Sequence, residues 1–486
     1  MPAGEAPEPQ ETPGFPPRCM IPIPVCCDMY KQLLEAAWPN PERFTQLVAT
    51  SGASLRSVLS SFTMYPQKIL KVVSAASLLL NAQPSTANPN CKIAHVEGEY
   101  AYLLPLPFEG NLTQDFVGGT TVQNKTVAYG LANAQTSPFV SYSKEFDDLL
   151  GAASLVAAVP EAPFPFTWAG EAGVWVPDHD QVWFVSTLYG GPTALYILFL
   201  NNNTVIKPEL KATGGYGTHI PLANPAGGYY FNGTVYLALV GDEREPSSLV
   251  AVDPDTFVVT PLVNSYFGLE LPPVDDVVVT YANTSQGVQR HIYFSTLDLS
   301  AFDLDVGRPA AVLPNAFWMF TPETKTLQPV IPRGDVMTPN GVAVDKGFRH
   351  LFVTDTTATA AVGGGSKWNV TGSPAIYRYD ISPEDGLVSN RVLFGITREG
   401  VSDGMKVDDQ GRVWTAEYEG IVVRNSVGKV IGLFNKEVIL GSRNPEVEMA
   451  NFALAGDTLV LLAVDKVYTV KLAETVMSAD RFFLPE

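Results

Sequence analysis

The chain has 486 residues, of which 46% are hydrophobic, so it is long enough to bury a large core and is globular rather than disordered. It carries 50 Asp and Glu against 31 Lys and Arg, a formal net charge of −19. A field of that sign repels phosphate backbones and argues against a nucleic-acid partner, whereas it suits a site that gathers cations.

The N-terminal part of the sequence contains a candidate signal peptide at residues 64–87. Lys68 and Lys71 form a basic flank, residues 72–80 an apolar core, and small residues follow at a plausible cleavage site. The apolar run is too short to span a bilayer. We therefore interpret residues 1–63 as an upstream extension, partly helical or disordered, that the mature protein lacks. In the alternative interpretation the first methionine is genuine and the apolar run belongs to a buried helix.

Glycosylation sequons support an extracellular location for the main body, and the positions of the cysteines restrict its chemistry. The four cysteines are Cys19, Cys26, Cys27 and Cys91, which excludes a disulfide framework or thiolate metal site beyond residue 91. Six Asn-x-Ser/Thr sequons follow the candidate signal peptide. Their acceptors are Asn111, Asn124, Asn202, Asn232, Asn283 and Asn369. We expect a secreted glycoprotein with no membrane partner.

Residues 88–150 form a lead-in segment without a strong pattern, and regular strand signals begin at about residue 151. Three segments share one design, namely an oxygen-bearing side chain, an alternating strand, a polar hairpin turn and an apolar strand. They are "EAGVWVPDHDQVWFVS", "NGVAVDKGFRHLFVTD" and "DGMKVDDQGRVWTAE". The first polar residue precedes the central aromatic by 12, 12 and 11 residues, from Glu171 to Trp183, Asn340 to Phe352 and Asp403 to Trp414.

A fourth, weaker copy starts at Asp275, and other strand pairs fill the gaps between the copies. The 40 Gly, 39 Pro and many short strands favour an all-β fold. Four-stranded units that repeat every 50 to 60 residues or so are typical of a β-propeller. Residues 151–486 have room for roughly six blades, so we predict a six-bladed β-propeller. We expect Trp175, together with the three aromatics named above, to lie in the cores of the blades.

The repeated polar residue predicts a metal site. In a propeller, the innermost strand of each blade begins near the central channel, so Glu171, Asp275, Asn340 and Asp403 should converge there. Carboxylates and an amide are hard oxygen ligands, which suit Ca²⁺ best, then Mg²⁺ or Mn²⁺. In the alternative interpretation each residue merely caps its own turn. His219 could face the channel mouth and contact substrate, or lie in a surface loop.

The motifs "GEAGVW", "TPNGVAV…LFVTDT" and "VSDGMKVDDQGRVW" resemble those of the gluconolactonase, senescence-marker-protein and luciferin-regenerating-enzyme superfamily of six-bladed propellers. Similarity to the secreted fungal lactonohydrolases extends over roughly residues 139–475. The resemblance implies that Glu171, Asn340 and Asp403 are metal ligands. It also implies hydrolysis of aldonolactones and related lactones with calcium or a similar divalent ion.

Four positions depart from the pattern of the fungal relatives. Gly170 replaces a histidine, Ala226 and Asp275 each replace an asparagine, and Thr296 replaces an aspartate. Three carboxylates around one ion should hold it well but weaken its Lewis acidity, and they should disfavour anionic ligands. Substrate choice has therefore moved, or hydrolysis has been lost.

Two function classes follow. The first is a metal-dependent lactonase that opens a polyhydroxy or secondary-metabolite lactone, in which the ion polarises the carbonyl and Asp403 deprotonates the attacking water. The second is a non-hydrolytic propeller that binds a small ligand or serves a biosynthetic step, with a purely structural calcium.

Overall fold

The computed structural model describes most of the chain beyond residue 92. The described ranges are 93–111, 114–159, 164, 167–187, 193–213, 222–285, 287–297, 311–361, 366–368, 372–441 and 449–484. The extension 1–63, the candidate signal peptide 64–87, all four cysteines, His219 and Asn369 lie outside the described residues, and the predictions for them stay predictions.

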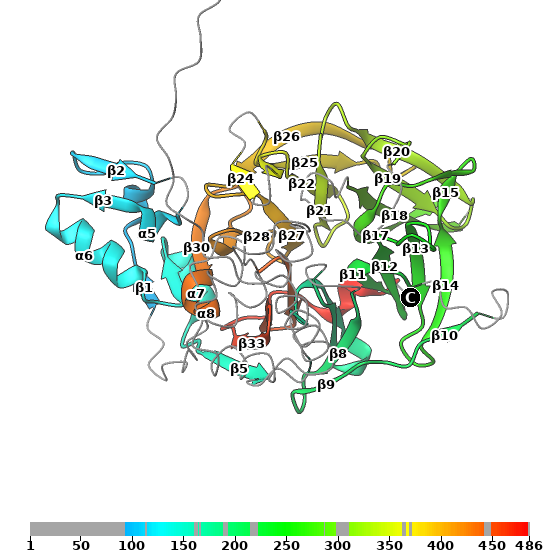
Figure 1. Cartoon of the computed structure of the whole chain (residues 1–486), viewed down its shortest axis with the longest axis horizontal. Coiled ribbons are helices and arrows are strands. Elements are labelled where there is room, and N and C mark those ends of the chain that lie inside the picture. The colour runs from blue at the N-terminus through cyan, green and yellow to red at the C-terminus, as the bar shows by residue number, and fades with distance from the viewer. Residues whose placement is uncertain are drawn as a thin grey trace, which may run out of the picture. The chain divides into compact units, whose positions relative to one another are not determined.

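Six sheets surround a central channel, so the predicted all-β, six-bladed β-propeller is confirmed (Figure 1). The four main strands of each blade follow one another from the innermost to the outermost position in five of the blades. The first blade has β6 (Glu171–Val176), β7 (Gln181–Val185), β8 (Leu195–Phe199) and β9 (Thr204–Ile206). The second has β11 (Pro225–Phe231), β12 (Thr234–Leu239), β13 (Ser248–Val252) and β14 (Val258–Val263), with β10 (Lys211–Ala212) at its edge. The third has β17 (Val274–Thr284), β18 (Gly287–Thr296), β19 (Ala316–Thr321) and β20 (Thr326–Pro332).

The remaining blades complete the ring. The fourth has β21 (Pro339–Val344), β22 (His350–Asp355), β25 (Ala375–Ile381) and β26 (Val388–Ile396). The fifth has β27 (Ser402–Val407), β28 (Val413–Glu417), β29 (Gly420–Arg424) and β30 (Val430–Asn435). The sixth has β31 (Phe452–Ala455), β32 (Thr458–Ala463) and β33 (Lys466–Lys471). Its outermost strand comes from early in the chain, because β5 (Leu155–Val159) pairs antiparallel with β33 and so closes the ring.

The lead-in segment is built into the fifth blade. Strand β4 (Phe139–Ser141) pairs antiparallel with β30, and β1 (Ile93–His95) pairs parallel with β4, which gives that sheet six strands. The lead-in also contains α5 (Phe116–Gly119), α6 (Lys125–Ala134), α7 (Lys144–Leu150) and the hairpin β2 (Phe108–Gly110) and β3 (Thr120–Val122). In the part of the chain that the structure describes, no helix is long and apolar enough to cross a membrane.

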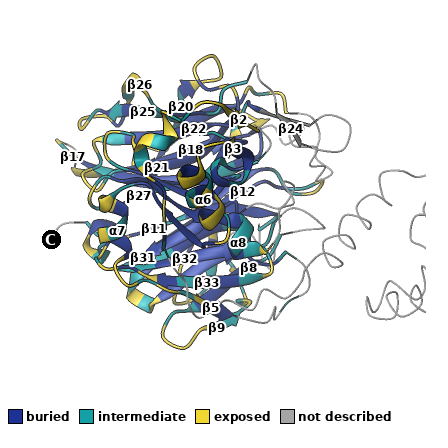
Figure 2. Cartoon of the chain, turned by 90° about the vertical axis from the view of Figure 1, so that its left-hand side faces the viewer, coloured by how far each residue is buried: buried dark blue, intermediate teal, exposed yellow. Residues whose placement is uncertain are grey.

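The shorter elements connect the blades. They are β15 (Ser265–Tyr266), β16 (Leu269–Glu270), β23 (Thr359–Ala361), β24 (Ser366–Trp368), α8 (Lys436–Leu440) and the 3₁₀ helices η1 (Gly98–Ala101), η2 (Pro177–His179) and η5 (Ala479–Phe482). Burial follows the blade order, with the inner strands buried and exposed residues concentrated on the outer loops and edges (Figure 2). Trp183 and Trp414 are fully buried in the main core, as expected. Trp175 is different, because its half-buried side chain lines the central cavity.

Five of the six inner strands share a β-bulge at the channel entrance. The pairing of each inner strand with its neighbour shifts between its first residue and the residue three further on. The first residues are Glu171, Pro225, Val274, Pro339 and Ser402. A repeated bulge re-aims the same two side chains in each blade, which is how the fold brings distant residues to one rim.

Glycine at the third position of the bulge lets neighbouring inner strands touch. A Cβ added to Gly173 would lie 2.1 Å from the backbone oxygen of Phe452 in the sixth blade. One added to Gly341 would lie 2.2 Å from the backbone oxygen of Asp403. These separations are shorter than any real contact, so a side chain would push adjacent blades apart.

Buried acidic residues gather where the lead-in meets the fifth blade. The Oε1 atom of Glu419 accepts hydrogen bonds from the backbone N–H of Phe116 at 3.2 Å and from Arg398 at 3.1 Å. Burial raises the pKa of Glu419 to about 8; Arg398 opposes the shift, and Glu417, with other nearby carboxylates, adds to it.

The first prediction concerns the contact between blades. Gly173→Ala should lower the free energy of unfolding by about 3 kcal/mol or more, because backbone atoms of Phe452 block the new Cβ. Gly233→Ala is the matched control, since Gly233 also has a positive φ but faces open space. This variant should lower the free energy of unfolding by only about 1–2 kcal/mol, the cost of an alanine in the left-handed conformation. Equal losses in urea unfolding would contradict the close approach.

The second prediction concerns Glu419. An unfolded glutamate ionises above about pH 4.5, whereas the folded one keeps its proton to higher pH, so this group makes the fold less stable as pH rises from about 4.5 to 8. Glu419→Gln removes that penalty and keeps the accepting oxygen. Relative to wild type, the variant should therefore gain stability through this range, by about 3 kcal/mol at pH 8.5. The exposed control Glu109→Gln should follow the wild-type pH profile, and a parallel profile for Glu419→Gln would refute the assignment.

Candidate functional site

Three of the four predicted ligands occupy one rung of the channel rim. Asp275, Asn340 and Asp403 are each the second residue of the bulge in their blade. Glu171 is the first residue of its bulge, so it lies one position out of that register. At the shared rung the second blade carries Ala226. The residues at this rung are therefore acidic or carry an amide in the third, fourth and fifth blades, and the residue of the second blade is apolar.

Asn340 has the clearest mark of a ligand site. Its side chain is 4% exposed, and its Oδ1 atom has no hydrogen-bond partner. The surrounding backbone is held firmly, since the N–H of Gly341 donates to Thr354 Oγ1 at 2.8 Å and the N–H of Thr338 donates to Asp355 at 3.2 Å. A buried oxygen without a hydrogen-bond partner costs free energy, so this atom indicates that a cation or a hydrogen-bond donor binds here.

Two residues that sequence reasoning missed support Glu171. The ammonium group of Lys406 donates to Asn451 Oδ1 at 3.1 Å and to the backbone oxygen of Ala172 at 3.4 Å. Asn451 Nδ2 in turn donates to Glu171 Oε2 at 3.4 Å. The amide thus links a lysine of the fifth blade to the predicted ligand of the first. Asn451 lies directly before β31, close to the position at which other inner strands carry a polar residue, and this is the signal that could have found it.

Asp276 is the third missed residue. It occupies the bulge position that is glycine in the other four bulged strands, and its carboxyl is 6% exposed. Burial raises the pKa of Asp276, while the Lys406 ammonium and the Val342 N–H act against the rise. Burial and the adjacent Asp276 together raise the pKa of Asp275. Two neighbouring buried carboxyls compete for ionisation, so the pair bears less negative charge than the sequence suggests.

Lys406 brings a positive charge under the ring. Burial lowers the pKa of its ammonium group, and the negative charges of Asp276, Glu171 and Asp403 oppose that shift. The ammonium therefore shares its electrostatic environment with two of the predicted metal ligands. The sequence had predicted three uncompensated carboxylates, and this lysine changes that balance.

The donor set fits a divalent ion in part. Among the described residues, no group of three or more His, Cys, Asp and Glu side chains lies close enough to hold a metal. Glu171, Asp275 and Asp403 do not, as they stand, form a three-carboxylate site. The carboxylates of Glu171 and Asp403, together with the unpartnered amide oxygen of Asn340, are compatible with an oxygen-liganded cation such as Ca²⁺. Asp275 fits less well than the other three.

The structure explains two of the four residues that differ from the pattern of the fungal relatives, Gly170 and Thr296. A Cβ on Gly170 would lie 2.3 Å from Thr187 Cγ2, so Thr187 fills the space of a side chain there. Thr296 accepts from the N–H of Ala316 at 3.0 Å and from Trp318 Nε1 at 3.2 Å, which holds the third blade together. Both positions serve packing in this chain.

The fold and the rim define a six-bladed propeller with an oxygen-rich site at one end of its channel. Residues 292–433 match the family described as SMP-30/Gluconolactonase/LRE-like region, and the predicted resemblance to this superfamily is confirmed. Lactonohydrolase oryL of Aspergillus oryzae is 25% identical over 331 residues, which are 62% of this chain and 70% of that protein. Lactonohydrolase oryH of the same organism is 25% identical over 322 residues, 54% of this chain and 66% of its own length. The solved structure of XC5397, a gluconolactonase from Xanthomonas campestris, superposes with a TM-score of 0.50 at 17% identity. It covers 68% of this chain and 94% of its own, and it shows the shared fold.

The third prediction tests the charge of Lys406. Two unit charges about 4 Å apart interact by about 4 kcal/mol at an effective dielectric constant of 20, so an ammonium near the ring should weaken divalent binding. Lys406→Met should raise calcium affinity about tenfold or more in isothermal titration calorimetry. Lys429→Met, on an exposed turn of the same blade, should leave it unchanged. If both variants match wild type, Lys406 does not oppose the ion; if no protein binds calcium, the metal site itself fails.

Proposed function

We propose that this chain is a divalent-metal-dependent lactone hydrolase that uses Ca²⁺, or Mg²⁺ or Mn²⁺. The observation that carries the proposal is the buried, unpartnered oxygen of Asn340 on the same rung as Asp403. Relatives named as lactonohydrolases support a hydrolase of the lactonase type. Glu171, Asn340 and Asp403 would hold the ion.

The chemistry divides between the ion and the protein. When bound, a divalent ion supplies Lewis acidity toward the lactone carbonyl and the oxyanion that develops on it. Asp403 accepts a proton from water as the water oxygen bonds to the carbonyl carbon. The ring C–O bond then breaks, and the proton passes to the ring oxygen, which gives a hydroxy acid. Asp275 would contact the substrate from the same rung; His219, the other predicted substrate contact, lies outside the described residues.

The charge around the rim indicates a neutral substrate. Glu171, Asp403 and Asp276 share one environment with a single lysine. Such a field disfavours an anionic lactone but tolerates a polyhydroxy or secondary-metabolite lactone without charge. The product is a carboxylate, so the same field favours its release. This asymmetry between neutral substrate and anionic product suits a hydrolase.

A second function also has an observation in its favour. Lys406 places a built-in cation beside the ligands, and Gly170 and Ala226 remove polar groups that the fungal pattern provides. A propeller that binds a small ligand without hydrolysis, with a structural calcium, would share these features. A lactone panel assayed with and without chelator separates the two. Chelator-sensitive ring opening supports hydrolysis, whereas thermal destabilisation by chelator without turnover supports the binding protein.

We further propose that the protein is secreted and glycosylated. The five sequon asparagines that the structure describes are exposed: Asn111, Asn124, Asn202, Asn232 and Asn283. Exposure is a requirement for glycan attachment to the folded protein. Sequencing the N-terminus of protein recovered from medium tests the location, since an N-terminus before residue 64 would contradict the signal peptide at residues 64–87.

The fourth prediction tests Asp403. Asp403→Asn keeps the size of the side chain but removes the proton acceptor, so kcat on a hydrolysed lactone should fall by about 10²–10⁴-fold. Asp345→Asn, at the hairpin turn after β21 and remote from the rim, should retain wild-type kcat. Melting curves with and without calcium should accompany the assay, because they report whether the variant still binds the ion. Full turnover in Asp403→Asn would exclude it as the base.

A further inference from the structure

The 3₁₀ helix η5 lies at the end of the central channel opposite the rim, where Arg481 bonds to the last residues of β21 and β27. Helix η5 (Ala479–Phe482) follows the sixth blade and brings Arg481 and Phe482 to the ends of the inner strands. Together with these strands it encloses a cavity whose empty space, its open mouth included, is about 520 Å³. Its lining includes Asp276 and Lys406, and also Trp175, Tyr229, Arg481 and Phe482, which we call the channel floor.

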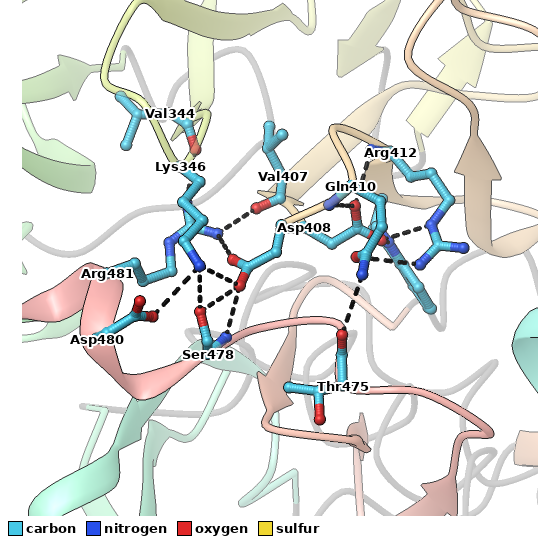
Figure 3. Close-up of polar contacts among 12 residues, drawn as sticks. Val344, Lys346, Val407, Asp408, Gln410, Arg412, Thr475, Ser478, Asp480 and Arg481 are labelled. Carbon is cyan, nitrogen blue, oxygen red and sulfur yellow. Dashed lines mark hydrogen bonds and ion pairs between the residues drawn. The ribbon is translucent and has the colours of Figure 1, made fainter.

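Arg481 is fixed at this floor by three contacts. Its guanidinium donates to the backbone oxygen of Val407 at 2.8 Å, to that of Val344 at 2.9 Å, and to Asp409 at 3.2 Å (Figure 3). Its side chain is 2% exposed. These contacts use three of its five N–H donors, and the Nε–H is buried without a hydrogen-bond partner. A charged donor left unsatisfied on the wall of a cavity points to a ligand.

Two more unsatisfied groups lie around the same aromatic ring. The indole Nε1 of Trp175 and the hydroxyl of Tyr229 are buried without a hydrogen-bond partner. Both rings pack on Phe482, with centroids 5.9 Å and 5.7 Å away. Burial raises the pKa of the Tyr229 hydroxyl; the nearby Arg481 guanidinium acts against the rise, and the Asp409 carboxylate adds to it. The floor thus offers three donors, contributed by the first blade, the second blade and the C-terminal helix.

We propose that the channel floor binds one small monovalent anion of the halide type. Indole and guanidinium N–H groups can only donate, and a phenol donates readily, so the common partner must be an acceptor. Among the cavity-lining side chains, Lys406 and Arg481 are cationic and Asp276 is the single carboxylate. Asp409 contacts the Nη1 edge of Arg481 and leaves Nε–H for the ligand. None of the three donors is a predicted metal ligand, and a bound anion would tie the C-terminal helix to two inner strands.

Bromide is the probe for this site. Crystals of the wild-type protein soaked in sodium bromide should show an anomalous peak within hydrogen-bond distance of Trp175 Nε1, Tyr229 Oη and Arg481 Nε. In solution, bromide should raise the wild-type Tm by about 2–4 °C over a chloride-free buffer of equal ionic strength. The double variant Trp175→Phe, Tyr229→Phe removes two donors while keeping aromatic rings against Phe482, and it should lose this rise.

Tyr379→Phe provides the matched control. The Tyr379 hydroxyl is also buried and unpartnered, but Tyr379 belongs to β25, the third strand of the fourth blade, and does not line the cavity. Its loss should leave the bromide-dependent rise in Tm intact. Water or a cation at the floor of the bromide-soaked crystal would overturn the proposal, as would an equal rise in Tm for all three proteins. Calcium binding at the rim is measured separately, so failure here leaves the proposed function standing.

Discussion

The structure depends on the contact between backbones of adjacent inner strands. A bulge at the start of β6, β11, β17, β21 and β27 turns the strand into the channel, and at four of these five starts a glycine allows the next blade to approach. The same geometry aims the preceding residue at the rim. The bulge that allows tight closure of the ring therefore also places Asp275, Asn340 and Asp403 at equivalent positions of their strands.

The channel then separates two electrostatic environments. Its rim gathers carboxylates and an amide, its middle holds Lys406, and its floor holds Arg481 among aromatic rings. Buried charges are tolerated when they are paired and hydrogen-bonded, and each of these cations has such partners. The β-propeller permits this separation because inner strands far apart in sequence, and the helix η5 that follows the last blade, supply side chains to one cavity.

Much of the fold was predictable from the sequence, and the hairpins that start at Glu171, Asp275, Asn340 and Asp403 form as expected. Lys406 escaped prediction because it alternates with the apolar Met405 and Val407, a pattern that usually means a solvated face. In the innermost strand both faces are covered by other blades, so that rule fails there. The strands β1 and β4 also escaped, because each has only three residues and pairs with blades far along the chain.

At two of the positions that depart from the fungal pattern, the structure shows which neighbouring groups the changed residue contacts. Thr187 fills the space beside Gly170, and Thr296 makes hydrogen bonds within its own blade. At the rim, Asp275 follows an apolar arc that includes Ala226, while Asn340 and Asp403 retain the amide and the carboxylate. The side of the rim with Asn340 and Asp403 keeps the groups that would act on a carbonyl. The side with Ala226 lacks a polar group that would hold a substrate hydroxyl. Under the lactonase function proposed above, this more apolar binding wall would favour the less hydroxylated members of the lactone class.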